Sequence, residues 1–155
     1  MDLERVEAIN KKVLIVENPN VYISIRNFIK RFSLNISLIC TGGQLNQCAY
    51  SFLNKINLSD IQCFYSGDID PEGILIAQNI KNKYGDIKLI GFNRDLYLKY
   101  KSHIDLSETS IKKLRNIKIT SEITFELIEE INKLKKPAYQ ELFVEEILEE
   151  IGRCL

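Results

Sequence analysis

Net charge is the first thing this 155-residue sequence lacks, because 21 Lys and Arg residues balance 21 Asp and Glu residues. An overall electrostatic attraction to nucleic acid or to a membrane surface is therefore not indicated. Long apolar runs are also missing, and no stretch approaches the ~20 residues that span a bilayer. The charged N-terminus (Met-Asp-Leu-Glu-Arg-Val-Glu) lacks the apolar core of a signal peptide. These absences predict a soluble, cytoplasmic protein with no membrane partner.

Metal-binding thiol and imidazole groups are scarce as well. The four cysteines are too irregularly spaced for a zinc site, and each lies in an apolar context; they are Cys40, Cys48, Cys63 and Cys154. We expect these cysteines to be small core residues of a protein in a reducing compartment. His103, the only histidine, lies in an irregular polar stretch, where we expect it on the surface.

What the sequence does contain is an alternation of buried strands and amphipathic helices. Apolar runs rich in β-branched residues predict strands at 12–16, 36–40, 61–65 and 87–92. Apolar residues at helical spacing predict the intervening helices at 19–32, 45–56 and 71–84. This order is typical of a parallel sheet with helices on both faces, so the predicted fold class is α/β.

The pattern changes after residue 92. We expect an irregular, tyrosine-rich segment from Asn93 to Lys101, then a short helix after Ser107 and a longer helix over about 121–135. Pro137 is expected to start the last helix.

The length of the chain fits one domain with a substantial core. We therefore predict a single domain over residues 1–155. Its core is expected at about 12–92, and a helical C-terminal extension at about 93–155.

Acidic residues stand where two of the predicted strands end. Glu17 follows the first strand, and Asp68 and Asp70 follow the third, directly before Pro71 opens a helix. Because parallel strands point the same way, these carboxylates should meet at one edge of the sheet, where α/β proteins bind ligands. Carboxylate oxygens suit Mg²⁺, and a carboxylate of such a cluster can serve as general base. The alternative is that the two aspartates are turn and N-cap residues.

Two further stretches fit phosphate binding. Thr41-Gly42-Gly43 ends the second strand, and glycine N–H groups before a helix can approach a phosphate; a tight turn explains these residues equally well. Residues 81–118 carry ten Lys and Arg against four Asp and Glu, which indicates either a nucleic-acid-binding face or a solvated surface. The cations that we assign to this face are Lys112, Lys113 and Arg115.

These residues carry a family resemblance. Glu17 after one hydrophobic strand and Asp68-Ile-Asp70-Pro-Glu-Gly73 after another resemble the TOPRIM domain of primases, topoisomerases and related nucleases. The form Asp-x-Asp-Pro-x-Gly is similar to that of the archaeal topoisomerase VI A subunit and its meiotic relatives. A wider set, spanning roughly residues 12–151, resembles the C-terminal domain of the Wadjet plasmid-defence nuclease subunit (JetD) and its bacterial relatives. That set is Glu17-Asn18-Pro19, Cys40-Thr41-Gly42-Gly43-Gln44, Gly67-Asp68-x-Asp70 and Tyr139-Gln140-Glu141.

The resemblance implies a TOPRIM, Rossmann-like fold and cleavage of DNA phosphodiesters with Mg²⁺ or Mn²⁺, in defence against plasmids or other foreign DNA. It implies that Asp68 and Asp70 bind metal and that Glu17 binds metal or acts as acid/base. Glu141 is either a further metal ligand or a solvated acid, and Glu72 is an expected outer-shell acid. The implied partners are DNA, a condensin-like ATPase complex and a second copy of the chain.

One departure from these relatives concerns length. They carry N-terminal DNA-binding regions, including a winged helix, which in the topoisomerases supply the tyrosine that attacks DNA. Only sixteen residues precede Glu17, so we expect an excised C-terminal domain or a minimal protein, and hydrolysis by water rather than through a tyrosine adduct.

Other functions fit the same fold. One is a non-catalytic module that holds nucleic acid or a partner protein, and another is the metal-binding domain of a topoisomerase VI A-like protein. A phosphate receiver with Asp68 as acceptor is disfavoured, because Glu17 is followed by Asn18 rather than by a second acid and no fifth strand ending in lysine is predicted.

Overall fold

A computed structural model describes residues 7–43, 47–56, 61–85, 87–120 and 122–154. The expected helix at 45–56 therefore begins outside the described residues. Residues 1–6 also lie outside them. Within the described part no helix is long and apolar enough to cross a membrane.

The centre of the fold is a four-stranded, all-parallel sheet, as the sequence predicts. The strands are β1 (Lys12–Val16), β2 (Ser37–Cys40), β3 (Gln62–Ser66) and β4 (Ile87–Leu89), in the order β2-β1-β3-β4. Val13 to Val16 in β1 are all fully buried, as expected for a central strand covered on both faces. Val16 is in register with both Cys40 and Ser66, so β1, β2 and β3 end at the same edge of the sheet.

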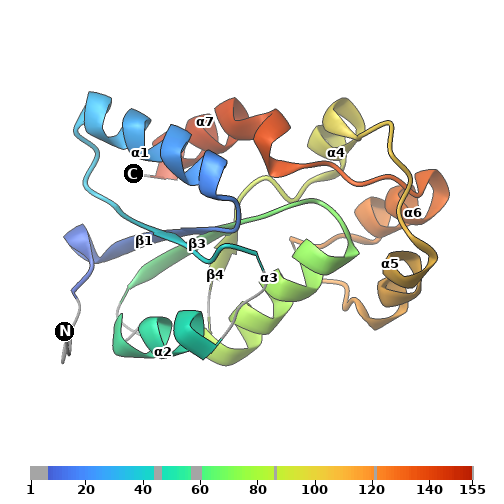
Figure 1. Cartoon of the computed structure of the whole chain (residues 1–155), viewed down its shortest axis with the longest axis horizontal. Coiled ribbons are helices and arrows are strands. Elements are labelled where there is room, and N and C mark those ends of the chain that lie inside the picture. Colours follow the sequence, from blue (N-terminus) through green and yellow to red (C-terminus); the bar gives the residue numbers. More distant parts are fainter. Residues whose placement is uncertain (1–6, 44–46, 57–60, 86, 121, 155) are drawn as a thin grey trace.

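Helices cover both faces of this sheet (Figure 1). α1 (Pro19–Phe32) and α7 (Val144–Cys154) pack side by side on one face, and α2 (Gln47–Ile56) and α3 (Pro71–Tyr84) lie on the other. α1 begins at Pro19 because Asn18 caps it, accepting a hydrogen bond from the N–H of Asn20 at 2.8 Å. The α/β fold class is thus confirmed, and its layers are those of a Rossmann-like fold.

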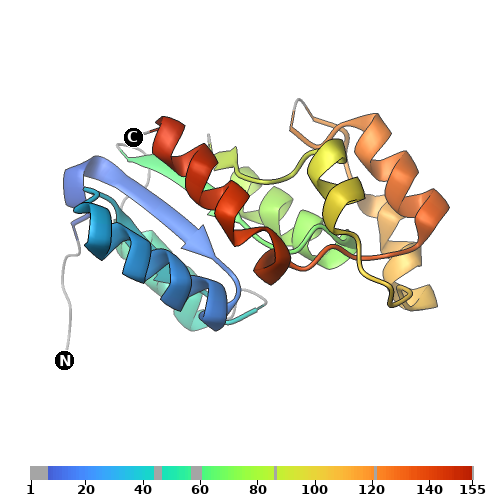
Figure 2. The same ribbon diagram turned by 90° about the horizontal axis from the view of Figure 1, so that it is seen from above.

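The C-terminal extension continues beyond the carboxyl ends of the strands (Figure 2). The helices that lie there are α4 (Arg94–Tyr100), α5 (Glu108–Lys113) and α6 (Phe125–Leu134), with a short 3-10 turn at Leu114–Asn116, whereas α7 returns to pack beside α1. α5 packs against α3, and α4 packs against α6. α6 begins later than expected because Thr124 caps it, accepting a hydrogen bond from the N–H of Leu127.

The prediction of an irregular segment from Asn93 to Lys101 is wrong, because this stretch holds helix α4. The side chain of Asn93 accepts a hydrogen bond from the N–H of Leu96 at 2.9 Å and starts the helix. A helix of seven residues is too short for apolar periodicity to reveal it, and its stability comes from burying Leu96 and Tyr97. The fourth strand is also shorter than predicted, since it ends at Leu89 rather than at residue 92.

The last helix does not start at Pro137. Residues after it stay extended, because Ala138 forms a two-residue bridge with Ile69. A 3-10 turn then covers Gln140–Phe143, and α7 follows from Val144. Backbone pairing to another segment has therefore overridden the helix-starting preference of proline here.

Phe143 ties this C-terminal turn to the sheet. Its ring is fully buried, lies 6.1 Å from that of Tyr100, and comes within 3.2 Å of the point where Gly91 would carry a Cβ. We expect Phe143→Ala to lower the free energy of unfolding by about 3–5 kcal/mol, as large-to-small core substitutions do. Urea denaturation followed by circular dichroism measures this.

The neighbouring Leu142 is the matched control, because its side chain is 52% exposed. Leu142→Ala should change stability by less than about 0.5 kcal/mol. Equal effects of the two substitutions would contradict the account of Phe143 as a core anchor.

Candidate active site

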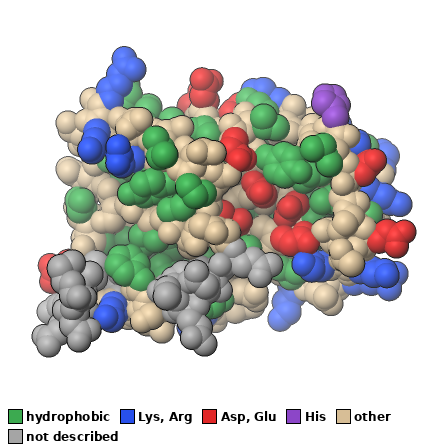
Figure 3. Space-filling model, in the orientation of Figure 1, with side chains coloured by type: hydrophobic (Ala, Val, Ile, Leu, Met, Phe, Trp, Pro, Cys, Tyr) green, Lys and Arg blue, Asp and Glu red, His purple; other side chains and the backbone are tan. Residues whose placement is uncertain are grey.

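Three acidic residues meet at the carboxyl edge of the sheet, as their positions in the sequence predict. Glu17 follows β1, and the Gly67–Asp70 loop follows the adjacent strand β3. The charges of Asp68 and Asp70 both act on the carboxyl of Glu17, which requires that the three groups lie near one another. On the face seen in Figure 3, acidic side chains gather near the middle, where Figure 1 shows the segments after β1 and β3.

Backbone N–H groups hold the two aspartates. Asp70 caps α3, and its Oδ1 accepts a hydrogen bond from the N–H of Gly73 at 2.8 Å. Asp68 Oδ1 accepts a hydrogen bond from the N–H of Gln140 at 2.7 Å. A Cβ at Gly73 would lie 2.2 Å from the carbonyl oxygen of Asp68, so only glycine lets α3 start this close to the loop. The N-cap interpretation is therefore correct for Asp70, and it leaves the second oxygen of this carboxylate for other contacts.

The segment after Pro137 forms one wall of the site. Ile69, between the two aspartates, donates to the carbonyl of Ala138 at 2.8 Å and accepts from its N–H at 3.1 Å. Glu141, at the end of the Tyr139-Gln140-Glu141 stretch, accepts a hydrogen bond from Asn18 Nδ2. The charge of Glu141 also acts on Asp68, so the structure brings this predicted metal ligand to the acidic cluster.

The contact that the sequence did not indicate is made by Tyr65. Its hydroxyl donates a hydrogen bond to Glu17 Oε1. Tyr65 stands on β3 as a fully buried residue, and apolar patterning alone assigns it to the core. The feature that brings Tyr65 to Glu17 is that β3 lies next to β1. This strand order is known from the structure and not from the sequence pattern.

Burial dominates the electrostatics of the cluster. It raises the pKa of Glu17 from an ordinary 4.5 to about 7; the hydrogen bond from Tyr65 opposes the rise, and the charges of Asp68 and Asp70 add to it. Burial likewise raises the pKa of Asp68 from 3.8 to about 6, against the lowering effect of the N–H of Gln140. The pKa of Asp70 is also raised by burial, although the N–H of Gly73 opposes it and the charge of Lys113 lowers it.

The donor chemistry of this cluster fits a hard cation. Carboxylate oxygens are the usual ligands of Mg²⁺, which commonly takes one or two carboxylates and completes its shell with water and substrate phosphate. Asp68 and Asp70 can supply those two. Among the described residues, no three His, Cys, Asp or Glu side chains lie close enough to hold a metal ion as they stand. Ligation by Glu17 or Glu141 as well would therefore require side-chain movement.

The Thr41-Gly42-Gly43 turn lies at the same edge but is tied to β1. The N–H of Thr41 donates to the carbonyl of Val16 at 3.0 Å, and the N–H of Gly43 donates to the carbonyl of Glu17 at 3.1 Å. The Gly43 N–H is therefore occupied and is not free to receive a phosphate. Residues 44–46, where the following helix was expected to begin, lie outside the described part of the chain.

The three cations of the predicted basic face differ in their surroundings. Lys112 and Arg115 are exposed, whereas Lys113 forms an ion pair with Glu72 at 3.0 Å. Ser110 Oγ donates to the same Glu72 oxygen at 2.8 Å. Although burial raises the pKa of Glu72, these two hydrogen bonds lower it below its ordinary value. Glu72 thus pairs with Lys113 and holds this cation near Asp70.

The sequence predicts core positions for the cysteines and a surface position for the histidine, and the structure agrees for some of these residues. Cys63 is buried, but Cys40 and Cys154 are half-buried; all three are free thiols. The side chain of Cys48 lies outside the described residues. His103 is exposed, as expected.

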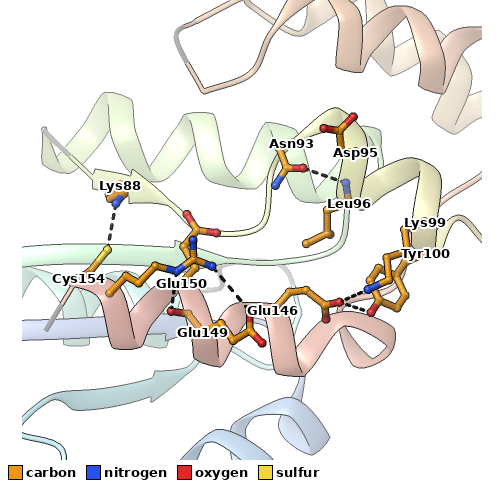
Figure 4. A pocket seen from close by; sticks show the side chains of 11 residues that line it. Lys88, Asn93, Asp95, Leu96, Lys99, Tyr100, Glu146, Glu149, Glu150 and Cys154 are labelled. Carbon is orange, nitrogen blue, oxygen red and sulfur yellow. Dashed lines mark hydrogen bonds and ion pairs between the residues drawn. The ribbon is translucent and has the colours of Figure 1, made fainter.

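A separate hollow of about 610 Å³ lies between α4 and α7 (Figure 4). Several of its charged groups pair with one another, since Lys99 pairs with Glu146 at 2.7 Å and Arg153 with Glu149 at 3.8 Å. Lys88 Nζ donates to Cys154 Sγ at 3.0 Å. This hollow therefore offers less to a ligand than the acidic edge does.

The raised pKa values predict how the metal-free protein responds to pH. An acid whose folded-state pKa is raised stabilises the fold below its ordinary pKa, and this stability is lost as pH rises through the folded-state pKa. The window runs from about 3.8 to about 6 for Asp68 and from about 4.5 to about 7 for Glu17. In EDTA, the wild type should lose on the order of 2 kcal/mol more stability between pH 5 and pH 8 than Glu17→Gln does.

Chemical denaturation at several pH values measures this difference. Glu149→Gln, which changes an exposed acid on α7, is the control and should follow the wild type. Parallel stability curves for wild type and Glu17→Gln would contradict the raised pKa.

Comparison with known proteins places the chain in a protein family. A search of curated proteins finds no match to this chain. Residues 2–151 match the family described as "protein of unknown function C-terminus (DUF2399)", and the match takes in β1, the aspartate loop and the segment that carries Glu141. Because it covers nearly the whole sequence, the chain belongs to this DUF2399 family.

Proposed function

We propose that this chain is a metal-dependent nuclease domain of the TOPRIM class that hydrolyses DNA phosphodiesters. The observation that carries the proposal is the meeting of Glu17, Asp68 and Asp70 at the carboxyl edge of a parallel sheet, where burial raises their pKa values. Carboxylates held in this way are short of a compensating cation. Membership of the DUF2399 family is consistent with the resemblance to the Wadjet nuclease subunit, from which plasmid or other foreign DNA follows as the proposed substrate.

Each residue has a role in this proposal. Asp68 and Asp70 hold Mg²⁺ or Mn²⁺, because backbone N–H groups already fix one oxygen of each. Bound metal supplies charge neutralisation at the phosphate that is attacked. Glu17 takes the proton of the attacking water, because its carboxyl lies beside the two aspartates that would hold the metal. Glu141 adds negative charge beside Asp68.

A second candidate is a non-catalytic module that keeps the fold to hold nucleic acid or a partner. The observation in its favour is that no three acidic side chains among the described residues converge to bonding distance of one cation. Cleavage assays distinguish the two functions.

Nicking of supercoiled plasmid in millimolar Mn²⁺ tests the proposal. The wild type should relax and linearise the plasmid, and Asp68→Asn/Asp70→Asn should not. Glu17→Gln should cleave ~10²–10⁴-fold more slowly, because it removes the general base but keeps the shape of the side chain. Its DNA affinity should not fall, because the substitution removes a negative charge.

Glu149→Gln is the matched control, since it neutralises an acid outside the site and should leave the rate unchanged. Cleavage by the wild type and Glu17→Gln at one rate would refute the role of Glu17. DNA binding by the wild type without cleavage would favour the non-catalytic module.

The basic face generates a further prediction, on salt dependence. Each phosphate contact contributes ~0.9 to the slope of log affinity against log salt. Reversing the two exposed cations, in Lys112→Glu/Arg115→Glu, should therefore weaken DNA binding and reduce that slope by about 2. Lys113 is left intact because its loss would also remove the ion pair of Glu72.

Fluorescence anisotropy with a labelled duplex at several salt concentrations gives the slope. Lys30→Glu/Arg31→Glu makes the same charge change in the last turn of α1, away from the acidic edge, and should leave the slope unaltered. An unaltered slope in the α5 variant would assign Lys112 and Arg115 to the solvated surface.

A further inference from the structure

Tyr65 is a buried residue whose polar end reaches the acidic cluster. The side chain is 0% exposed, and its ring stacks on that of Phe92 at 6.0 Å with an interplanar angle of 20°. Its backbone is in register with Ile15, so the hydroxyl extends along the sheet to reach Glu17, two residues further on. Packing therefore fixes the ring and, through it, the position of the hydroxyl.

The hydroxyl and the carboxylate meet over Gly67. A Cβ at Gly67 would lie 2.3 Å from Glu17 Oε1 and 2.7 Å from the hydroxyl oxygen of Tyr65. Any side chain at this position would therefore displace the carboxylate or the tyrosine. Gly67 lies where the strand turns into the aspartate loop. Because it has no side chain, it also leaves room for the carboxylate of Glu17.

The energetics of this contact favour one orientation of Glu17. A phenol buried without a partner would lose the hydrogen bonds it makes to water, and Glu17 Oε1 is the partner that the described residues provide. A hydrogen bond to a charged acceptor is also stronger than one between neutral groups. The bond therefore fixes the position of Oε1 and leaves Oε2 as the oxygen that can contact water or metal.

We infer that Tyr65 is a positioning residue that holds the Glu17 carboxylate in its working orientation through the Oε1 hydrogen bond. The inference rests on the proposed function, because the orientation matters only if Glu17 acts on water or metal. The hydroxyl is fully buried, so Tyr65 acts through Glu17 rather than on the substrate. Partners that orient a ligand or base in this way typically contribute ~10–100-fold to activity or metal affinity.

Tyr65→Phe is the variant that removes the hydroxyl and keeps the ring on Phe92. Tyr97→Phe is its matched control, since Tyr97 is equally buried and its hydroxyl donates to the carbonyl of Lys136 at 2.9 Å rather than to a carboxylate of the cluster. Both variants lose one buried hydrogen bond and should show similar small drops in Tm. Only Tyr65→Phe should lower kcat for plasmid nicking, by ~10–100-fold, with the Kd for DNA unchanged.

A readout without catalysis is the rise in Tm on adding Mn²⁺, since a ligand that binds only the folded state stabilises it. We expect Tyr65→Phe to need ~10-fold more Mn²⁺ than Tyr97→Phe for the same rise. The double variant Tyr65→Phe/Glu17→Gln should cleave at the rate of Glu17→Gln alone, because residues that act as a unit are not additive.

The outcomes separate the two proposals. An active wild type, with Tyr65→Phe matching Tyr97→Phe in kcat and in Mn²⁺ response, would overturn the role of Tyr65 alone. So would a full further loss of rate on adding Tyr65→Phe to Glu17→Gln. A wild type that neither cleaves DNA nor responds to Mn²⁺ would overturn the proposed function together with the inference that rests on it.

Discussion

The cost of burying charged carboxylates, to which their mutual repulsion adds, is the constraint on which the acidic edge depends. Glu17, Asp68 and Asp70 lie near one another at the end of a buried sheet, and burial makes the charged form of each costly. The protein offsets this cost mainly with hydrogen-bond donors. The N–H of Gly73, the N–H of Gln140 and the hydroxyl of Tyr65 each donate to one carboxylate. Lys113, which pairs with Glu72, is a cation whose charge lowers the pKa of Asp70.

Those donors explain why the C-terminal extension belongs to the site. The bridge between Ile69 and Ala138 keeps the chain extended after Pro137 and presents the N–H of Gln140 to Asp68. Phe143 then anchors the same segment in the core beside Gly91. The extension is thus a structural wall of the acidic edge as well as a cover beyond the sheet. The proposed nuclease would depend on both halves of the chain.

Most of the fold could be predicted from the sequence because buried parallel strands and amphipathic helices have distinct apolar periods. The sheet, three of its crossover helices and the meeting of Glu17 with the aspartates follow from those periods and from strand direction. Helix α4 could not be found in this way, because two buried residues in seven define no period. The extended segment at Ala138 was missed because its conformation is set by pairing with Ile69, almost seventy residues earlier. Tyr65 was assigned to the core correctly, but its bond to Glu17 depends on β1 and β3 being neighbours, which strand propensity does not encode.

The central claim is that the acidic edge is a metal site, and anomalous diffraction from crystals soaked in Mn²⁺ tests it most directly. The account predicts an anomalous peak bonded to carboxylate oxygens of Asp68 and Asp70, with Glu17 Oε1 still accepting from Tyr65. Mn²⁺ prefers the same oxygen donors as Mg²⁺, so the peak reports on the proposed cofactor as well. The absence of a peak at this edge, or a peak that touches neither aspartate, would contradict the account.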